Sequence, residues 1–295
     1  MSGSLLQRLG AGVASLVGRQ HPLVRAARPA YEALLDIVTL GRGFQRTVNG
    51  TDRFNVDPRL RHLFPEIYEP AVWAFLRSRV KPGDVVLNVG AHVGLYTLGA
   101  AAWSAPGGRV VAFEPNPATR LILEDHVRRN GAEDRVEVIA AAAGASEGEA
   151  RFAAEAVEGT SRIGEPNPES RTPATMLTVR VTTIDAVCRE RALKPDWIIM
   201  DVEGLEGDAL EGARSVLAGA PPPGVVVEFH PHLWSSAGWS RARLEGLVTD
   251  LALVPVPIAG QRDPWTEAGV VFLRGVSERH FRQAQQPTSP AVPYD

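Results

Sequence analysis

The sequence predicts an α/β fold with a doubly wound, mostly parallel sheet behind an N-terminal helical extension. Three observations support this prediction. Short apolar runs recur along residues 85–273 between turn-forming residues, as expected for strands buried on both faces. Helix-length segments separate the first runs, which indicates parallel strands joined by crossover helices. Polar residues suited to ligand binding follow several runs directly, where the carboxyl ends of parallel strands lie.

The individual elements follow from apolar periodicity. The predicted strands are Val85–Val89, Arg109–Phe113, Val136–Ile139, Leu177–Val181, Trp197–Met200 and Val225–Phe229, with Leu251–Val256 and Val270–Leu273 as a terminal pair. Helices are expected at Leu95–Trp103 and Thr119–Asn130. The interval 154–176 and the region 1–67 differ from the sheet in composition, so we expect them to cover the ligand crevice and to influence substrate choice.

Composition and charge narrow the functional classes. A net charge of −3 gives no argument for binding nucleic acid. The sequence contains no run of about eighteen apolar residues, so we expect no membrane span. The single cysteine, Cys188, excludes an intrachain disulfide, and we expect a cytoplasmic protein. Lysine occurs only at Lys81 and Lys194, so a lysine nucleophile is not expected.

The chain divides into three predicted regions. Residues 1–67 form the helical extension, residues 68–282 the main domain and residues 283–295 a Pro-rich, disordered tail. The first 31 residues lack acids, and one helical face carries Leu5, Leu9, Val13 and Leu16. We interpret this face as packing on the main domain or on a second copy of the chain in a homo-oligomer. A targeting or membrane-surface helix is the alternative.

The stretch "VVLNVGAHVGLYT" predicts a cofactor site. It is a buried strand that enters a glycine turn, and Glu114 ends the next strand in "VVAFEPNP". Glycines let the backbone approach a ligand, the following helix offers free N–H groups to an anion, and a carboxylate can accept hydrogen bonds from two ribose hydroxyls. The spacing Gly90-x-x-x-Gly94 departs from the G-x-G-x-x-G of NAD sites and favours S-adenosylmethionine.

These motifs belong to a wider resemblance. The stretches "YEPAVWAFLRSRVKPGDVVLNVGAHVGLYT", "VEVIAAAAGASEGEARF", "VTTIDAVC", "DWIIMDVEGLEGDALEGA" and "GVVVEFHPHLW" resemble the FkbM-type family of S-adenosylmethionine-dependent methyltransferases over roughly residues 68–234. The DVEG-x-E block at Asp201–Glu206 is the most specific part. The resemblance implies a class I methyltransferase (Rossmann-like) fold and methyl transfer, usually to a hydroxyl of a sugar or natural product.

The expected cofactor contacts follow from the turn, the ribose carboxylate and this resemblance. They are Asn88, Gly90, Ala91, His92, Gly94, Glu114, Pro115, Asn116, Ala142 and Asp201. The chain departs from the family at two positions: Asn88 stands where Asp is usual, and Ile199 stands where Lys is usual. The first change weakens a contact to the cofactor's ammonium group and the second removes a charged group. Both leave open a methyltransferase-like scaffold that binds without turnover.

An alcohol acceptor must lose its proton, so a base is expected nearby. His230 is the favoured base because of its near-neutral intrinsic pKa, with a purely structural hydrogen-bonding role as the alternative. Asp201 and Glu228 are the other candidates, whereas Glu203 is interpreted as organising its loop.

Two further alternatives concern cofactors. Asp201, Glu228 and His230 form a plausible magnesium ligand set, but no tight ligand spacing supports it, so the sequence predicts no metal site. A nicotinamide-dependent oxidoreductase on the same sheet is disfavoured by the glycine spacing and by the DVEG block.

Overall fold

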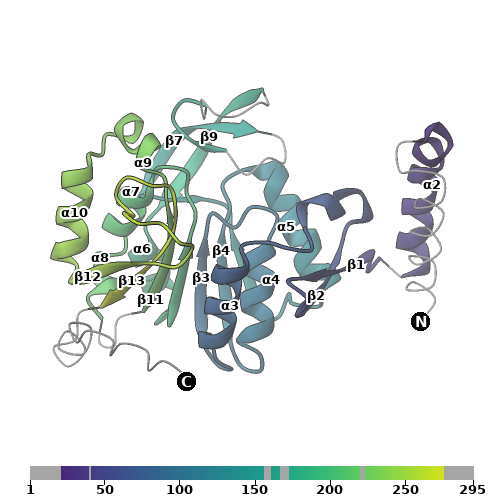
Figure 1. Ribbon diagram of the computed structural model, residues 1–295, viewed down its shortest axis with the longest axis horizontal. Helices are drawn as coiled ribbons and strands as arrows, with labels where there is room; N and C mark the ends of the chain where they lie inside the picture. The colour runs from purple at the N-terminus through teal and green to yellow at the C-terminus, as the bar shows by residue number, and fades with distance from the viewer. Residues whose placement is uncertain (1–20, 40, 156–160, 167–172, 220–222, 276–295) are drawn as a thin grey trace, which may run out of the picture.

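The computed structural model describes residues 21–39, 41–155, 161–166, 173–219 and 223–275 (Figure 1). The apolar face predicted over residues 5–16 and the predicted tail 283–295 lie outside these ranges. Within them, no helix is long and apolar enough to cross a bilayer.

The core of the molecule is a seven-stranded sheet with the order β12-β13-β11-β10-β3-β4-β5. Its strands are β3 (Val85–Val89), β4 (Arg109–Phe113), β5 (Val136–Ile139), β10 (Trp197–Met200), β11 (Gly224–Phe229), β12 (Leu253–Pro257) and β13 (Gly269–Gly275). Neighbouring strands run parallel from β11 to β5, whereas β13 is antiparallel to both of its neighbours. The doubly wound, mostly parallel sheet predicted from the sequence is therefore confirmed.

Helices cover both faces of this sheet because its strands are apolar on both sides. One face, which includes Leu87 and Val89, packs against α6 (Ile184–Glu190), α7 (Glu206–Glu211), α8 (Arg214–Leu217) and α10 (Arg241–Asp250). The other face, which includes Val86, packs against α3 (Pro70–Arg79), α4 (Leu95–Trp103) and α5 (Pro117–Arg129). Figure 1 shows the two groups on opposite sides of the sheet. Both helices predicted between the first strands are confirmed.

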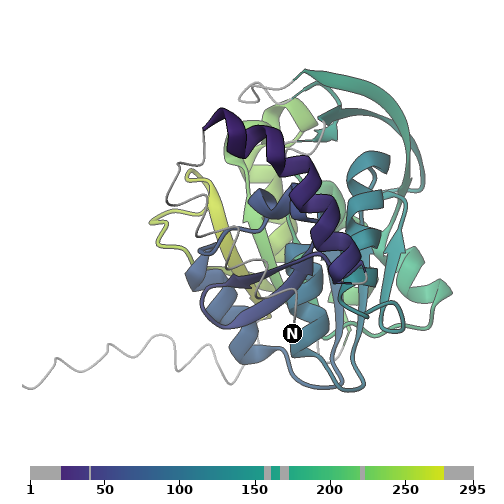
Figure 2. The same ribbon diagram turned by 90° about the vertical axis from the view of Figure 1, so that its right-hand side faces the viewer.

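The N-terminal extension is only partly helical. It contains α2 (Pro22–Val38), an antiparallel hairpin of β1 (Phe44–Val48) and β2 (Asp52–Val56), and a short 3-10 helix, η1 (Pro58–Leu63). The hairpin packs on the α3–α5 side of the sheet through Phe54 and Val56, and α2 lies outside the hairpin (Figures 1 and 2). A uniformly helical extension is therefore wrong for residues 44–56, where Phe54 and Val56 are buried on one strand face.

A second sheet lies over the carboxyl ends of the first. It has the order β6-β9-β7-β8 and consists of β6 (Ala142–Ala143), β7 (Gly148–Glu155), β8 (Arg162–Ile163) and β9 (Ala174–Thr182). The predicted strand at 177–181 is the second half of β9, which pairs with β7 from Ala174 to Val181. A four-residue helix, α9 (Pro231–Trp234), and a short turn of 3-10 helix, η2 (Ser235–Ala237), follow β11, and Ser236 accepts a hydrogen bond from Arg162 of β8.

Candidate functional site

The turn between β3 and α4 requires glycine at two positions. Gly90 has φ +81°, and a Cβ atom there would lie 1.7 Å from the carbonyl oxygen of Asp201. Gly94 has φ +97°, and a Cβ atom there would lie 2.6 Å from a methyl carbon of Leu123. The turn is held by the N–H groups of Gly90 and Ala91, which both donate to the carbonyl of Phe113. Close backbone approach to the neighbouring β10 end thus dictates the glycine at residue 90.

Glu114 locks this turn to the end of β4. Its Oε2 accepts a hydrogen bond of 2.7 Å from the N–H of His92, and its Oε1 accepts one of 2.8 Å from the N–H of Asn116. The side chain is buried, and burial raises its pKa to about 7 although both N–H groups oppose this shift. Each carboxylate oxygen keeps further acceptor capacity, which the two hydroxyls of a ribose could use.

Asn88 lies at the buried end of β3. Its Nδ2 donates a hydrogen bond of 2.8 Å to the hydroxyl of Thr97 on α4. The side chain is therefore tied to the helix that follows the turn. A carboxylate at this position could keep the bond, because the threonine hydroxyl can donate as well as accept.

A crevice at the carboxyl ends of the strands joins these groups. It encloses about 1180 Å³ of empty space, a volume that includes open solvent at its mouth. The predicted residues that line it are Asn88, Gly90, Ala91, His92, Glu114, Pro115, Ala142, Asp201 and Glu228. Three predicted residues do not line it: Gly94, Asn116 and His230. Asn116 instead caps α5 by accepting from the N–H of Ala118.

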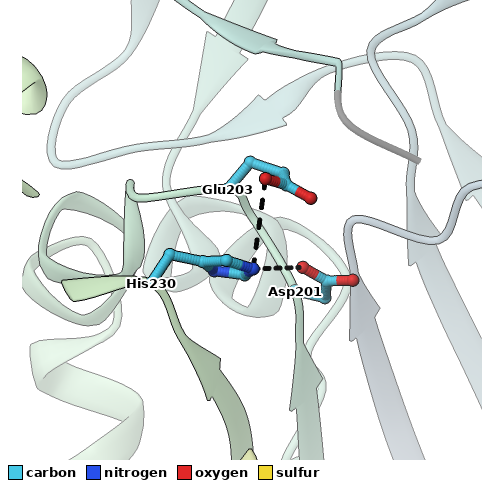
Figure 3. Close-up of side chains that lie close together, drawn as sticks. All are labelled: Asp201, Glu203 and His230. Carbon is cyan, nitrogen blue, oxygen red and sulfur yellow. Dashed lines mark ion pairs between the residues drawn. The ribbon is translucent and has the colours of Figure 1, made fainter. Parts of the chain in front are cut away.

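Three acidic side chains surround the imidazole of His230. Its Nε2 lies 3.9 Å from Asp201 Oδ1, 4.0 Å from Glu203 Oε2 and 3.8 Å from Glu228 Oε1. Figure 3 shows Asp201 and Glu203 pointing toward the same edge of the ring. The acids come from the loop after β10 and from β11, whose carboxyl ends are adjacent because these strands pair in parallel.

The other ring nitrogen of His230 is fixed by a buried acid. Nδ1 lies 2.8 Å from Glu206 Oε1, and Trp234 Nε1 donates a 2.8 Å bond to Glu206 Oε2. Burial lowers the pKa of His230, but the bond with Glu206 and the charges of Glu206, Asp201 and Glu203 raise it to about 10. The imidazole therefore carries a proton at neutral pH, which does not suit a base that acts there. The role of His230 stays a prediction.

The pKa values of the acids around His230 are raised. Burial raises the pKa of Asp201 and of Glu228, and the nearby charges of other acids raise both further, while His230 lowers them. Burial also raises the pKa of Glu203. A site that keeps several carboxyls close together and partly desolvated is typical of acid–base or ion-binding function.

Several lining residues escaped the sequence analysis. Tyr68, Glu69 and Tyr96 form one wall, with the Tyr96 hydroxyl donating to Glu69 Oε2 at 2.6 Å. Arg162 reaches the crevice from β8 and bonds Ser236, 74 residues away. Tyr68, Glu69 and Tyr96 stand in the first of the family-like stretches, but their spacing does not show that they face the crevice, because only the folded chain brings them there. The sequence carried one signal of the surroundings of His230: Glu206, the last acid of the DVEG-x-E block, which forms a hydrogen bond with His230.

Comparisons with known proteins agree with this geometry. The model for the FkbM methyltransferase domain matches residues 88–246, more than half of the chain. A comparison with curated proteins found no match.

Similar solved structures are methyltransferases or related proteins. A SAM-dependent O-methyltransferase from Thermotoga maritima has 13% identity and a TM-score of 0.44, over 75% of this chain and 71% of that one. An SAH-bound methyltransferase from Podospora anserina has 11% identity and a TM-score of 0.42, over 71% of this chain and 78% of that one. Aeropyrum pernix fibrillarin with bound S-adenosyl-L-methionine has 15% identity and a TM-score of 0.38, over 69% of this chain and 73% of that one. These TM-scores are too low to carry an argument.

The strand order and the family match together establish the fold. The five parallel strands β5-β4-β3-β10-β11, continued by antiparallel β13 and then β12, form the class I methyltransferase sheet. The matched segment starts at Asn88, in β3, and extends past the acid cluster and His230. The chain belongs to the FkbM methyltransferase family.

Proposed function

We propose that the protein transfers a methyl group from S-adenosylmethionine to a hydroxyl of a small molecule, such as a sugar or a natural product. One observation carries the proposal: a single crevice is lined by the Gly90 turn, by Glu114 and by the acids Asp201 and Glu228. Cofactor binding and proton removal can therefore take place side by side.

The cofactor would lie across the carboxyl ends of β3 and β4. Glu114 would accept from the ribose hydroxyls, and the turn at Gly90 and Ala91 would admit the methionine part close to the backbone. Ile199, where the family usually has lysine, is buried and lines the same crevice. This part of the wall is thus apolar and adds no charge next to the sulfonium.

The reaction needs alignment and one proton acceptor. The acceptor oxygen attacks the sulfonium methyl, an O–C bond forms as the C–S bond breaks, and S-adenosylhomocysteine leaves. Alignment within the crevice supplies much of the rate enhancement. The hydroxyl proton passes to a carboxylate, for which Glu228 and Asp201 are the two candidates, because both line the crevice. His230 does not line the crevice and would orient these acids.

The acceptor end favours a neutral or cationic small molecule. Glu69, Asp201, Glu203 and Glu228 all line the crevice. A phosphate-rich acceptor such as a nucleic acid would be repelled by these acids. Tyr68 also lines the crevice and offers an aromatic surface on which the ring of a sugar or natural product could pack.

Two measurements test the proposal. Calorimetry should show one S-adenosylhomocysteine bound per chain and no binding of NAD. A labelled-methyl assay against panels of sugars and hydroxylated natural products should then detect transfer. Binding without transfer to any acceptor would support the scaffold that Asn88 and Ile199 leave open. Absence of S-adenosylhomocysteine binding would refute the proposal.

A further inference from the structure

We propose that Asp201, Glu203 and His230 bind one divalent metal ion of the Mn²⁺ type at the edge of the crevice. One ligand atom from each residue can be chosen so that all three lie within 4.8 Å of one another. Around a six-coordinate ion with bonds of about 2.1 Å, ligand atoms lie about 3 Å apart when adjacent and about 4.2 Å apart when opposite. The separations of 3.9 and 4.0 Å from His230 Nε2 lie between these two values, so the side chains would close slightly around the ion on binding.

The hydrogen bonds of His230 are those of a metal ligand. A ligating histidine usually donates its second ring N–H to a carboxylate, which fixes the ring and its tautomer. Here Nδ1 bonds Glu206, which is fully buried and also accepts from Trp234 and from the N–H of Gly204. The His230 side chain is itself nine-tenths buried, and its Nε2 faces the acids beyond hydrogen-bond distance.

Asp201 supplies an independent observation. Its Oδ1, the atom nearest to His230 Nε2, is buried and has no hydrogen-bond partner among the residues that the structure describes, although the side chain as a whole is 43% exposed. A buried carboxylate oxygen in this state is costly unless a cation or a donor occupies its free lone pairs. An ion between Asp201 and His230 would satisfy it.

The charges around the site also favour a cation. The acids that act on it come from four elements: Asp201 and Glu203 from the β10 loop, Glu206 from α7, Glu228 from β11 and Glu69 from the start of α3. Arg162 is a permanent cation that acts on Glu203, and the carboxyls outnumber it. His230 must release the proton of Nε2 to bind an ion, so it adds no positive charge to the occupied site. A bound dication would offset this excess.

The ligand set indicates which ion fits. Two carboxylate oxygens and one imidazole nitrogen suit Mn²⁺ or a similar transition metal better than Mg²⁺ or Ca²⁺, which prefer oxygen ligands. Three protein ligands leave coordination positions open toward the crevice. If the proposed methyl transfer is correct, an acceptor hydroxyl could occupy one of them and lose its proton more readily. Metal binding itself does not depend on that reaction.

The test uses the full chain stripped of metals with EDTA and then dialysed. Titration with Mn²⁺, followed by the loss of the free-ion EPR signal, should show one ion per chain. Asp201→Asn and Glu203→Gln should each weaken binding by about 10-fold or more. Glu69→Gln is the matched control: it removes the same charge from the same crevice outside the ligand set, and its effect should stay below about 3-fold. Thermal unfolding confirms that each variant is folded.

Wild-type protein gives a second readout that needs no substitution. Pulsed EPR of the Mn²⁺ complex should show coupling to an imidazole nitrogen. Absence of stoichiometric binding, absence of this coupling, or equal losses in all three variants would overturn the inference. Titration with S-adenosylhomocysteine in EDTA separates the two proposals: cofactor binding without metal binding refutes only the metal site, and metal binding without cofactor binding refutes only the proposed function.

Discussion

Replacing Glu114 by glutamine would test the cofactor site directly. Both carboxylate oxygens accept backbone N–H groups, from His92 at 2.7 Å and from Asn116 at 2.8 Å. Glutamine keeps one acceptor, but its NH₂ group must face the other N–H. The substitution also removes the charge that would accept from ribose. We expect a loss of about 2–3 kcal/mol in S-adenosylhomocysteine affinity, or about 30- to 150-fold in Kd.

The pH dependence of binding provides an independent check. Burial raises the pKa of Glu114 to about 7, so the free protein holds a proton on this group below pH 7 and releases it above. Ribose hydroxyls bind the ionised form better, so affinity should fall as pH falls from 8 to 6, by at most about tenfold per pH unit. This dependence should disappear in Glu114→Gln.

Calorimetry at several pH values is the assay, and Glu133→Gln is the control because Glu133 is an exposed acid outside the crevice. Chemical denaturation separates the binding effect from lost stability, since one orphaned buried N–H costs about 1–3 kcal/mol of unfolding free energy. A folded Glu114→Gln variant with unchanged Kd would refute the ribose assignment.

Five further substitutions make up four predictions. Gly90→Ala should cost about 2 kcal/mol or more of stability in denaturation, because its Cβ would lie 1.7 Å from a backbone carbonyl oxygen. Asn88→Asp should raise S-adenosylhomocysteine affinity by about 0.5–1.5 kcal/mol in calorimetry, since it restores a charged acceptor. Glu228→Gln should lower single-turnover methyl transfer by about 10²–10⁴-fold at nearly unchanged cofactor affinity, and His230→Ala should lower it less. Burial lowers the pKa of His126, so the stability that the neutral imidazole contributes should be present above pH 6.5 and be lost as pH falls. The difference in unfolding free energy between wild type and His126→Gln should therefore shrink between pH 7 and pH 5.

Each of these predictions has a control or a contrary result. Gly148→Ala, where a Cβ would meet nothing within 4 Å, should leave stability nearly unchanged. A drop in affinity for Asn88→Asp would mean that the pocket requires a neutral side chain. A larger rate loss in His230→Ala than in Glu228→Gln would return the base to the histidine that the sequence favoured. A constant gap between wild type and His126→Gln across pH would show that this imidazole is not held neutral.

The sequence by itself determined the central sheet and the glycine turn after its first strand. Strands such as Val85–Val89 are buried on both faces, so their apolar runs are readable without any knowledge of their neighbours. Gly90 and Glu114 are local features of strand ends, and parallel pairing of β3 with β4 brings those ends together. Apolar runs were sufficient to predict the sheet, and two glycines with an acid at the next strand end were sufficient to predict the turn.

Only the tertiary structure decided the acceptor side of the site and the state of its histidine. The β1–β2 hairpin and the extent of β7 and β9 depend on which faces are covered by other segments. The partner of His230 is Glu206, 24 residues away, and its proximity raises the pKa of an imidazole that the sequence alone suggested would titrate near neutrality. Charge and hydrogen bonding between distant residues depend on distances of a few ångströms. Residue spacing does not specify those distances, and chain packing does.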